Sequence, residues 1–142
     1  MIKFQMKRRD AGYWQFIAGG GEDSESPAQA AEREIEEEIG LASGGRLLHL
    51  DSMATIPINC FAAADSWGHA IFVIPAYCFA IDAGDSPLTL SCEHTEVCWG
   101  SYMQAYSLLK WDSNRNALWE LHERLTARWD GGPEPNVDYP NL

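Results

Sequence analysis

The sequence contains no apolar run of the roughly 18 residues that a membrane-spanning helix needs. Its longest apolar stretch is Ala70–Ala80, and the segment Met1–Arg9 lacks the apolar centre of a secretory signal. These two absences predict a protein without a membrane partner, and we expect it in the cytoplasm.

Cysteine is scarce and is not arranged for metal or disulfide chemistry. The four cysteines form no CxxC pair, and no histidine stands at zinc-finger spacing from them. They are Cys60, Cys78, Cys92 and Cys98. We interpret them as reduced thiols, mostly within the core, which agrees with a cytoplasmic protein.

Positive charge is the third shortage, because 10 lysines and arginines stand against 21 aspartates and glutamates, for a net charge of −11. Proteins that bind DNA or RNA neutralise the phosphates with cationic side chains, so a nucleic-acid polymer is disfavoured as a partner. An acidic chain can still bind a small phosphate compound when a divalent cation bridges the two. The distribution of the acidic residues is therefore informative.

The 142 residues, 46% hydrophobic and 22% charged, suit one globular domain, which we place at residues 1–130. The proline-rich segment 131–142 is expected to be extended or disordered. Alternating apolar residues predict strands, and leucines spaced three or four apart predict a helix. The expected strands are Ile2–Arg8, Tyr13–Ile17, Arg46–Ile58, His69–Ile81 and Glu96–Tyr102, and the expected last helix is Asn114–Trp129.

Local chemistry predicts a further helix over Pro27–Ile39. Ser26 is a natural N-cap, Pro27 suits the first helical position, and Gln29 can complete a capping box with Ser26. Gly40 stands where a left-handed C-cap residue is favoured. Both ends of this helix are thus predicted from residues within or beside it.

The helix carries five glutamates against one base, Arg33, and its side chains divide between faces. The expected core stripe is Ala28, Ala31, Ile35 and Ile39, the neighbouring acidic stripe is Glu34, Glu37 and Glu38, and Glu32 and Glu36 point to solvent. Like charges at these spacings repel, and acids near the C-terminal end oppose the helix dipole. A divalent cation would turn the three convergent carboxylates into ligands, and Mg²⁺ prefers oxygen.

Most glutamate-rich helix faces are simply solvated, but the segment upstream favours a ligand site. The triple glycine Gly19–Gly21 lets the backbone approach a ligand closely, and Glu25 ends that loop beside Arg33. The whole segment reads G-x5-E-x7-R-E-U-x-E-E-x-G-U, where U is aliphatic. Its specified positions are Gly19, Glu25, Arg33, Glu34, Ile35, Glu37, Glu38, Gly40 and Leu41.

This pattern resembles the Nudix box, and average residue usage gives a chance match on the order of 10⁻⁷ or less. The resemblance implies a Nudix hydrolase with an α/β/α sandwich and a mixed sheet, which uses Mg²⁺ or Mn²⁺ to cleave a diphosphate linked to another moiety. The implied metal ligands are Glu34, Glu37 and Glu38, to which the Gly19 carbonyl can add. Arg33 and Glu25 resemble the pair that holds the loop against the helix.

Members of the resembled family usually supply a further carboxylate from a later loop. Glu93, in a Glu-His-x-x-x-x-Trp stretch, is the expected added metal ligand or general base, with Glu96 as the second choice. His94 is interpreted as a structural hydrogen-bonding residue rather than a base. The metal would lower the pKa of a water that attacks phosphorus in line.

Outside the box, the chain looks most like the bacterial branch that acts on dihydroneopterin triphosphate and dATP-like nucleotides. The matching segments are Arg8-Arg9-Asp10, Trp14-Gln15, Glu93-His94 and Ser113-Asn114-Arg115. A triphosphate needs cations and a flat ring needs aromatic walls, so Arg8 is the expected phosphate contact and Trp14 and Trp111 the expected ring contacts, with Trp67 a further candidate. Each tryptophan also suits the core.

The alternatives are a Nudix hydrolase acting on dinucleoside polyphosphates or oxidised dNTPs and a non-catalytic nucleotide-binding module. The module is disfavoured, because all box glutamates are present. Homodimers are common in the resembled family, although no exposed apolar stripe in the sequence demands one. Two departures stand out: Ile17-Ala18 replaces the usual Pro-Gly, and the chain starts too late for the family's first strand, which suggests an internal start at Met1.

Overall fold

The computed structural model describes residues 4–8, 12–22, 24–42, 47–62, 64–84 and 96–129. Its strands are β1 (Phe4–Arg8), β2 (Trp14–Gln15), β3 (Leu48–Pro57), β4 (Val73–Ala80) and β5 (Glu96–Gly100). Its helices are α1 (Pro27–Ile39), α2 (Tyr102–Leu108) and α3 (Asp112–Trp129), and short 3-10 turns span Ile58–Cys60 and Ala64–Ser66. None of the described helices is both long enough and apolar enough to cross a membrane.

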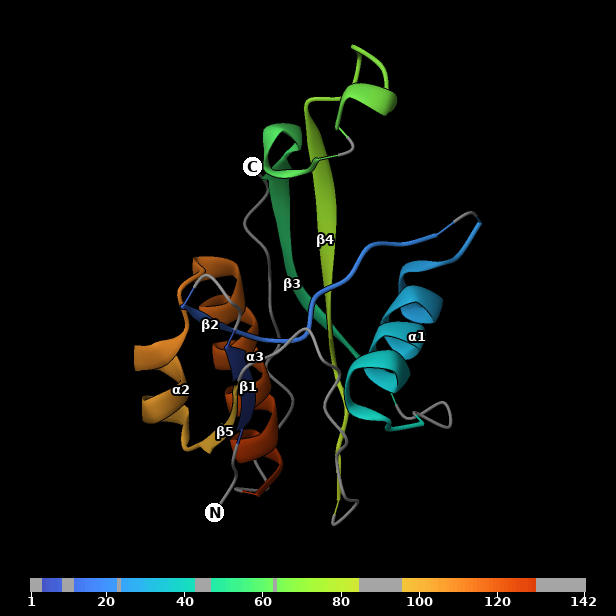
Figure 1. The fold of residues 1–142 in the computed structure, drawn as a ribbon. Coiled ribbons are helices and arrows are strands. Elements are labelled where there is room, and N and C mark those ends of the chain that lie inside the picture. Colours follow the sequence, from blue (N-terminus) through green and yellow to red (C-terminus); the bar gives the residue numbers. More distant parts are fainter. Residues whose placement is uncertain are drawn as a thin grey trace, which may run out of the picture.

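The strands form two antiparallel sheets. One has the order β2-β1-β5, and the other is the β3–β4 hairpin. Figure 1 shows α1 on one side of the hairpin and α2 and α3 on the other, which is the expected α/β sandwich. Parallel pairing is represented among the described residues by the bridge between Trp14 and Leu109. The expected mixed character of the sheet rests on that bridge alone in this part of the chain.

Two apolar clusters hold the layers together. The first joins β1 to α2 and α3 and consists of Phe4, Met6, Ala105, Leu109 and Leu118. The second is formed by Ile35 and Ile39 of α1 with Leu41, just after the helix. The cysteines follow the core prediction only in part. Cys98 packs on the first cluster and burial raises the pKa of the half-buried Cys78, but Cys60 is exposed and Cys92 lies outside the described residues.

Helix α2 was not predicted from the sequence, which extended the preceding strand to Tyr102. The strand instead ends at Gly100, because Ser101 starts a capping box: its Oγ accepts a hydrogen bond from the Gln104 amide (3.4 Å) and the Gln104 side chain accepts one from the Ser101 amide (2.9 Å). The other boundaries shift by a few residues. β4 begins at Val73 rather than His69, and α3 begins at Asp112 rather than Asn114.

A carboxylate of α3 fastens the base of the hairpin. The β3–β4 register shifts between His49 and Met53, and there Glu120 accepts hydrogen bonds from the amides of Asp51 (2.7 Å) and Ser52 (2.6 Å). Burial acts to raise the pKa of Glu120, but the hydrogen bonds from Ser52 and Asp51 and the charge of Arg124 outweigh it and lower that pKa. The irregular backbone is thereby satisfied by α3.

Candidate active site

Helix α1 forms as its sequence predicts. The Gln29 amide donates to the Ser26 Oγ (3.3 Å), the Gln29 side chain accepts from the Ser26 amide (2.8 Å), and Pro27 occupies the first turn. Gly40 ends the helix in the left-handed conformation (φ 67°) and its amide donates to the Glu36 carbonyl at 2.9 Å. These caps fix the position of every glutamate between them.

The buried face of α1 differs from the prediction in its first turn. Ile35 and Ile39 are buried as expected, but Ala28 is exposed and Ala30 is buried in its place. The glycine loop is the cause, since a Cβ built on Gly21 would lie 4.0 Å from the Ala30 Cβ. The loop covers the Ala30 side of the first turn and leaves the Ala28 side to solvent.

The three glutamates of the acidic stripe reach from the interior to the surface. Glu38 is buried (7% exposed), the Glu34 side chain is 17% exposed, and that of Glu37 is 59% exposed. Glu36 is exposed as predicted, whereas Glu32 is half-buried rather than directed fully to solvent. Moving ionised carboxylates out of water is costly without a nearby positive charge. The site therefore needs cations.

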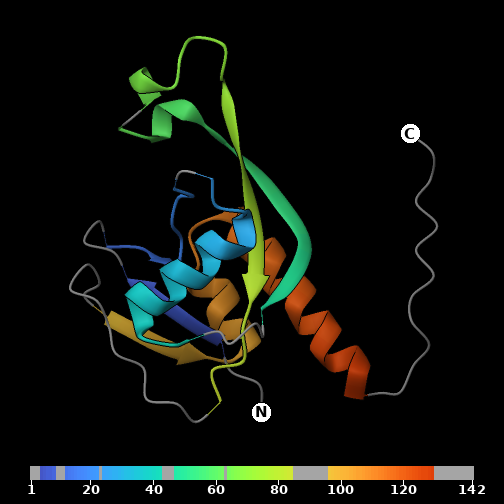
Figure 2. The same ribbon diagram turned by 90° about the vertical axis from the view of Figure 1, so that its right-hand side faces the viewer.

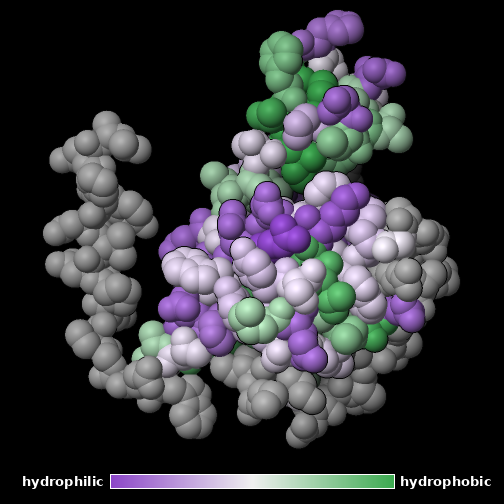
Figure 3. Space-filling view, turned by 90° about the vertical axis from the view of Figure 1, so that its left-hand side faces the viewer, coloured by the Kyte–Doolittle hydropathy of each residue, from purple (hydrophilic) through white to green (hydrophobic). Residues whose placement is uncertain are grey.

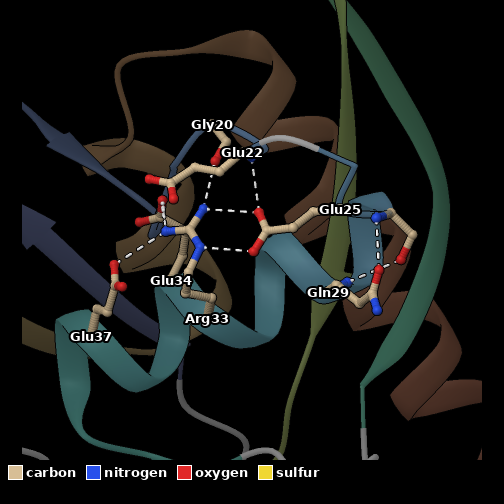
Figure 4. Close-up of polar contacts among 8 residues, drawn as sticks. Gly20, Glu22, Glu25, Gln29, Arg33, Glu34 and Glu37 are labelled. Carbon is tan, nitrogen blue, oxygen red and sulfur yellow. Dashed lines mark hydrogen bonds and ion pairs between the residues drawn. The ribbon is translucent and has the colours of Figure 1, made fainter.

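Arg33 supplies one such charge and lies at the centre of the polar network in Figure 4. Its Nη1 donates to Glu34 Oε1 (3.0 Å) and Glu37 Oε2 (3.2 Å). Its Nε donates to Glu25 Oε1 (3.0 Å), and its Nη2 donates to Glu25 Oε2 (3.2 Å) and to the Gly20 carbonyl (2.8 Å). The guanidinium thus joins the glycine loop to the glutamates of α1.

The charges of this network shift one another's pKa values. The Arg33 hydrogen bonds and the Glu22 amide, which donates to Glu25 at 2.9 Å, hold the pKa of Glu25 below its usual range. The same pairing with Glu25 raises the pKa of Arg33 further. Both groups are therefore charged at neutral pH, and the contact between loop and helix persists there.

Gly19 lies where any larger residue would displace the Glu34 side chain. A Cβ at this position would collide with the Glu34 carboxylate, whereas a Cβ at the adjacent Gly20 would meet no atom within 4 Å. The Gly19 backbone therefore lies directly beside the Glu34 carboxylate. Two of the predicted metal ligands, from loop and helix, are adjacent in the fold.

The donor set fits a hard divalent cation by its chemistry. Glu34, Glu37, Glu38 and the Gly19 carbonyl all offer oxygen, and one of the carboxylates is buried. Within the described parts of the chain, no three histidine, cysteine, aspartate or glutamate side chains are already gathered closely enough to form a metal centre. The positive charge between Glu34 and Glu37 in this arrangement is the Arg33 guanidinium.

The predicted site residues outside the box are described unevenly. Glu93 and His94 lie outside the described residues, as does the Arg8 side chain. The backbone register pairs Arg8 with Trp14 on one side and with Glu96 on the other. These three positions form one row across the β2-β1-β5 sheet.

The tryptophans divide between core and surface. Trp14 packs on the first apolar cluster, and Trp67 packs on Phe61 at 5.3 Å between ring centroids, near the far end of the hairpin. Trp111 is 43% exposed, and its Nε1 donates to Gln15 Oε1 at 3.3 Å. Of the predicted ring contacts, Trp111 is thus the one that presents an aromatic surface to solvent.

Residues that the sequence did not single out complete this aromatic surface. Tyr13 meets the Trp111 ring edge-on at 5.6 Å, and the Lys110 Nζ lies 4.4 Å from the Tyr13 ring centroid and 4.5 Å from that of Trp111. The segment Ser113-Asn114-Arg115 has a structural role here, because Asn114 Oδ1 accepts a hydrogen bond from the Phe16 amide at 3.1 Å. The bridge from Trp14 to Leu109, just before α3, brings these groups together from distant parts of the sequence.

Comparison with known proteins agrees with this geometry. The profile of the family described as NUDIX domain matches residues 1–121. A crystal structure from Listeria monocytogenes, of a protein described as a candidate Nudix hydrolase, is similar at 45% identity and a TM-score of 0.79, over 89% of this chain and 85% of that chain. No curated protein matches the sequence significantly.

Two more distant structures share the fold. The E. coli dihydroneopterin triphosphate pyrophosphohydrolase matches at 22% identity and a TM-score of 0.67, over 89% of this chain and 86% of that chain. A binary complex of the C. elegans Ap4A hydrolase matches at 19% identity and a TM-score of 0.62, over 88% of each chain. The family profile over residues 1–121 and the 45% identical Listeria structure, together with the filled box, show that the chain belongs to the Nudix family and is a Nudix hydrolase.

Proposed function

We propose that this Nudix hydrolase cleaves a phosphoric anhydride in a nucleoside- or pterin-linked triphosphate, with dihydroneopterin triphosphate or a dATP-like nucleotide as substrate and pyrophosphate as product. The observation that carries the proposal is the Arg33 network, which joins Glu34 and Glu37 to the glycine loop. It gathers carboxylates beside a loop whose backbone can approach phosphate oxygens.

The carboxylates of Glu34, Glu37 and Glu38, with the Gly19 carbonyl, would hold Mg²⁺ or Mn²⁺. When bound, such an ion neutralises phosphate charge and acidifies a coordinated water. Arg33 and Glu25 position the loop and the helix relative to each other. Glu93 is proposed as a further ligand or as the base that takes the proton of the attacking water.

The proposed substrate contacts lie beside β2. The exposed Trp111 ring with Tyr13 offers a surface on which a pterin or purine can stack, and Lys110 adds positive charge there. Arg8, in the adjacent strand, is the proposed phosphate contact. The E. coli structural neighbour is named for a pterin triphosphate, which supports this choice of ligand.

A dinucleoside polyphosphate is the second candidate substrate, because the C. elegans neighbour is named as an Ap4A hydrolase. A panel separates the two: dihydroneopterin triphosphate, dATP, 8-oxo-dGTP, diadenosine tetraphosphate and ADP-ribose are incubated with Mg²⁺, and pyrophosphate is measured separately from phosphate. Pyrophosphate from the pterin or dATP is the expected result. Turnover of diadenosine tetraphosphate, 8-oxo-dGTP or ADP-ribose without turnover of the pterin or dATP would refute the substrate class. No turnover of any compound in the panel would refute the proposal as a whole.

A further inference from the structure

The β3–β4 hairpin presents one face that nothing in the described structure covers. The register pairs Met53 with Tyr77, Thr55 with Pro75 and Pro57 with Val73, and paired residues point to the same side of a sheet. All six are exposed. We call this set, Met53, Thr55, Pro57, Val73, Pro75 and Tyr77, the hairpin face.

The far end of the hairpin projects beyond the body of the molecule, as Figure 2 shows. A two-stranded ribbon is at best marginally stable in water unless a face is covered. Yet Met53 is 62% exposed, Val73 49% and Tyr77 45%, and the adjoining Phe72 is 75% exposed. An apolar surface of this kind marks an interaction site.

The hairpin is also almost free of charge, in contrast to the rest of the chain. Residues 52–81 contain one acidic residue, Asp65, and no lysine or arginine, while the whole chain has a net charge of −11. Figure 3 shows green side chains, with some purple ones between them, on the protruding part and a band of purple side chains across the body below it. The hairpin is therefore almost uncharged, unlike the acidic helix α1.

We propose that the hairpin face binds the hairpin face of a second copy of this chain, in a twofold-symmetric dimer. Two copies with the same negative charge repel each other wherever acidic surfaces meet, so a self-interface has to be neutral. The hairpin face meets that condition. Two such ribbons can pack as sheets about 10 Å apart and bury each other's apolar side chains.

The dependence on salt follows from the same charges. Screening weakens the long-range repulsion between two acidic copies and leaves apolar contact intact, so self-association should become stronger as salt is raised. An interface built from ion pairs would respond in the opposite direction. Sedimentation velocity of the full chain at low and at physiological salt measures this sign directly.

The decisive comparison uses two substitutions of the same kind. Met53→Glu places a carboxylate on the hairpin face, and Met103→Glu places one on α2, where Met103 is 69% exposed. The wild-type chain and Met103→Glu should sediment at twice the 15.8 kDa of one chain. Met53→Glu should weaken the dimer by roughly hundredfold, because burial of a charge without a partner is costly.

Circular dichroism shows whether each variant is folded, and Val73→Glu, at the far end of the same face, provides a second test if Met53→Glu is not. Loss of the dimer in a folded hairpin variant with retention in Met103→Glu supports the proposal. A wild-type chain that stays monomeric up to about 200 µM overturns it. So does a dimer that survives both hairpin substitutions, and so does a monomer that binds neutral lipid vesicles through this face.

Discussion

The substitution Gly19→Ala should disable the site and leave the fold nearly unchanged. A Cβ at this position would collide with the Cδ and Oε1 atoms of the Glu34 carboxylate. These atoms are the far end of a flexible side chain that is 17% exposed, so Glu34 can swing away without moving the backbone. The variant then keeps helix α1 and loses one carboxylate from the proposed ligand set.

The expected magnitude follows from that displacement. Loss of one preorganised electrostatic contact costs about 3–4 kcal/mol of transition-state stabilisation, or a hundred- to thousandfold in kcat. The free energy of unfolding should hardly change. Replacing glycine with alanine lowers the conformational entropy of the unfolded chain, which stabilises the fold by roughly 0.4–1 kcal/mol and offsets the loss of the contact between Glu34 and Arg33. We expect Tm to stay within about 4 °C of the wild-type value.

The matched control is Gly20→Ala, since a Cβ at Gly20 meets no atom within 4 Å and the Gly20 carbonyl that accepts from Arg33 is retained. Mg²⁺-dependent hydrolysis of the best substrate of the panel gives kcat, calorimetric titration with Mn²⁺ gives metal affinity, and thermal melting gives Tm. A Gly19→Ala variant within about threefold of wild type in both kcat and metal affinity would refute the reasoning. Equal losses in the two variants would refute it as well.

Three further predictions concern other parts of the chain. Glu38→Gln should lower kcat by roughly hundredfold or more while Glu36→Gln, on the exposed face, changes it little, and steady-state kinetics of the two variants decides whether the helix faces are assigned correctly. Glu120→Ala should lower the free energy of unfolding by about 2–3 kcal/mol in urea titrations at pH 7, because the amide of Asp51 loses a charged acceptor. Since the pKa of Glu120 is lowered from 4.5 in the fold, the part of this difference that depends on the carboxylate charge is fully present above that pH and should disappear as the pH falls below the folded-state value; a difference that grows in acid would contradict it. Trp111→Ala should raise KM more than it lowers kcat if the ring stacks on substrate, and an unchanged KM would remove Trp111 from the substrate site.

The parts of the structure that the sequence predicted well are those controlled by neighbours in the chain. The ends of α1 follow from Ser26, Gln29 and Gly40, all within or beside the helix. The ion pair of Arg33 with Glu25 spans eight residues and was expected from the family resemblance. What failed depends on contacts between distant segments. The burial of Ala30 rather than Ala28 is set by the path of the glycine loop, which the helical periodicity does not contain.

Helix α2 shows a second limit of local reasoning. Its capping box, Ser101 with Gln104, was present in the sequence, but the apolar stretch before it suits a strand, and seven residues are too few for a helical period to stand out. Gly100 marks the junction, because a Cβ there would lie 3.0 Å from the Met6 side chain and 3.1 Å from Gln104. The turn from strand to helix is thus fixed by packing against β1.

The hairpin face illustrates why exposure is harder to predict than secondary structure. Strands β3 and β4 carry apolar side chains on both sides, so alternation along the sequence cannot tell which side is covered. In the fold, Ile56 and Ile74 are half-buried while Met53 and Tyr77 on the other side face solvent. Which side is exposed depends on how the hairpin packs against the rest of the fold. The hairpin face is the part of this strongly acidic chain that a second copy can approach with the least charge repulsion, which is why the proposed dimer uses it.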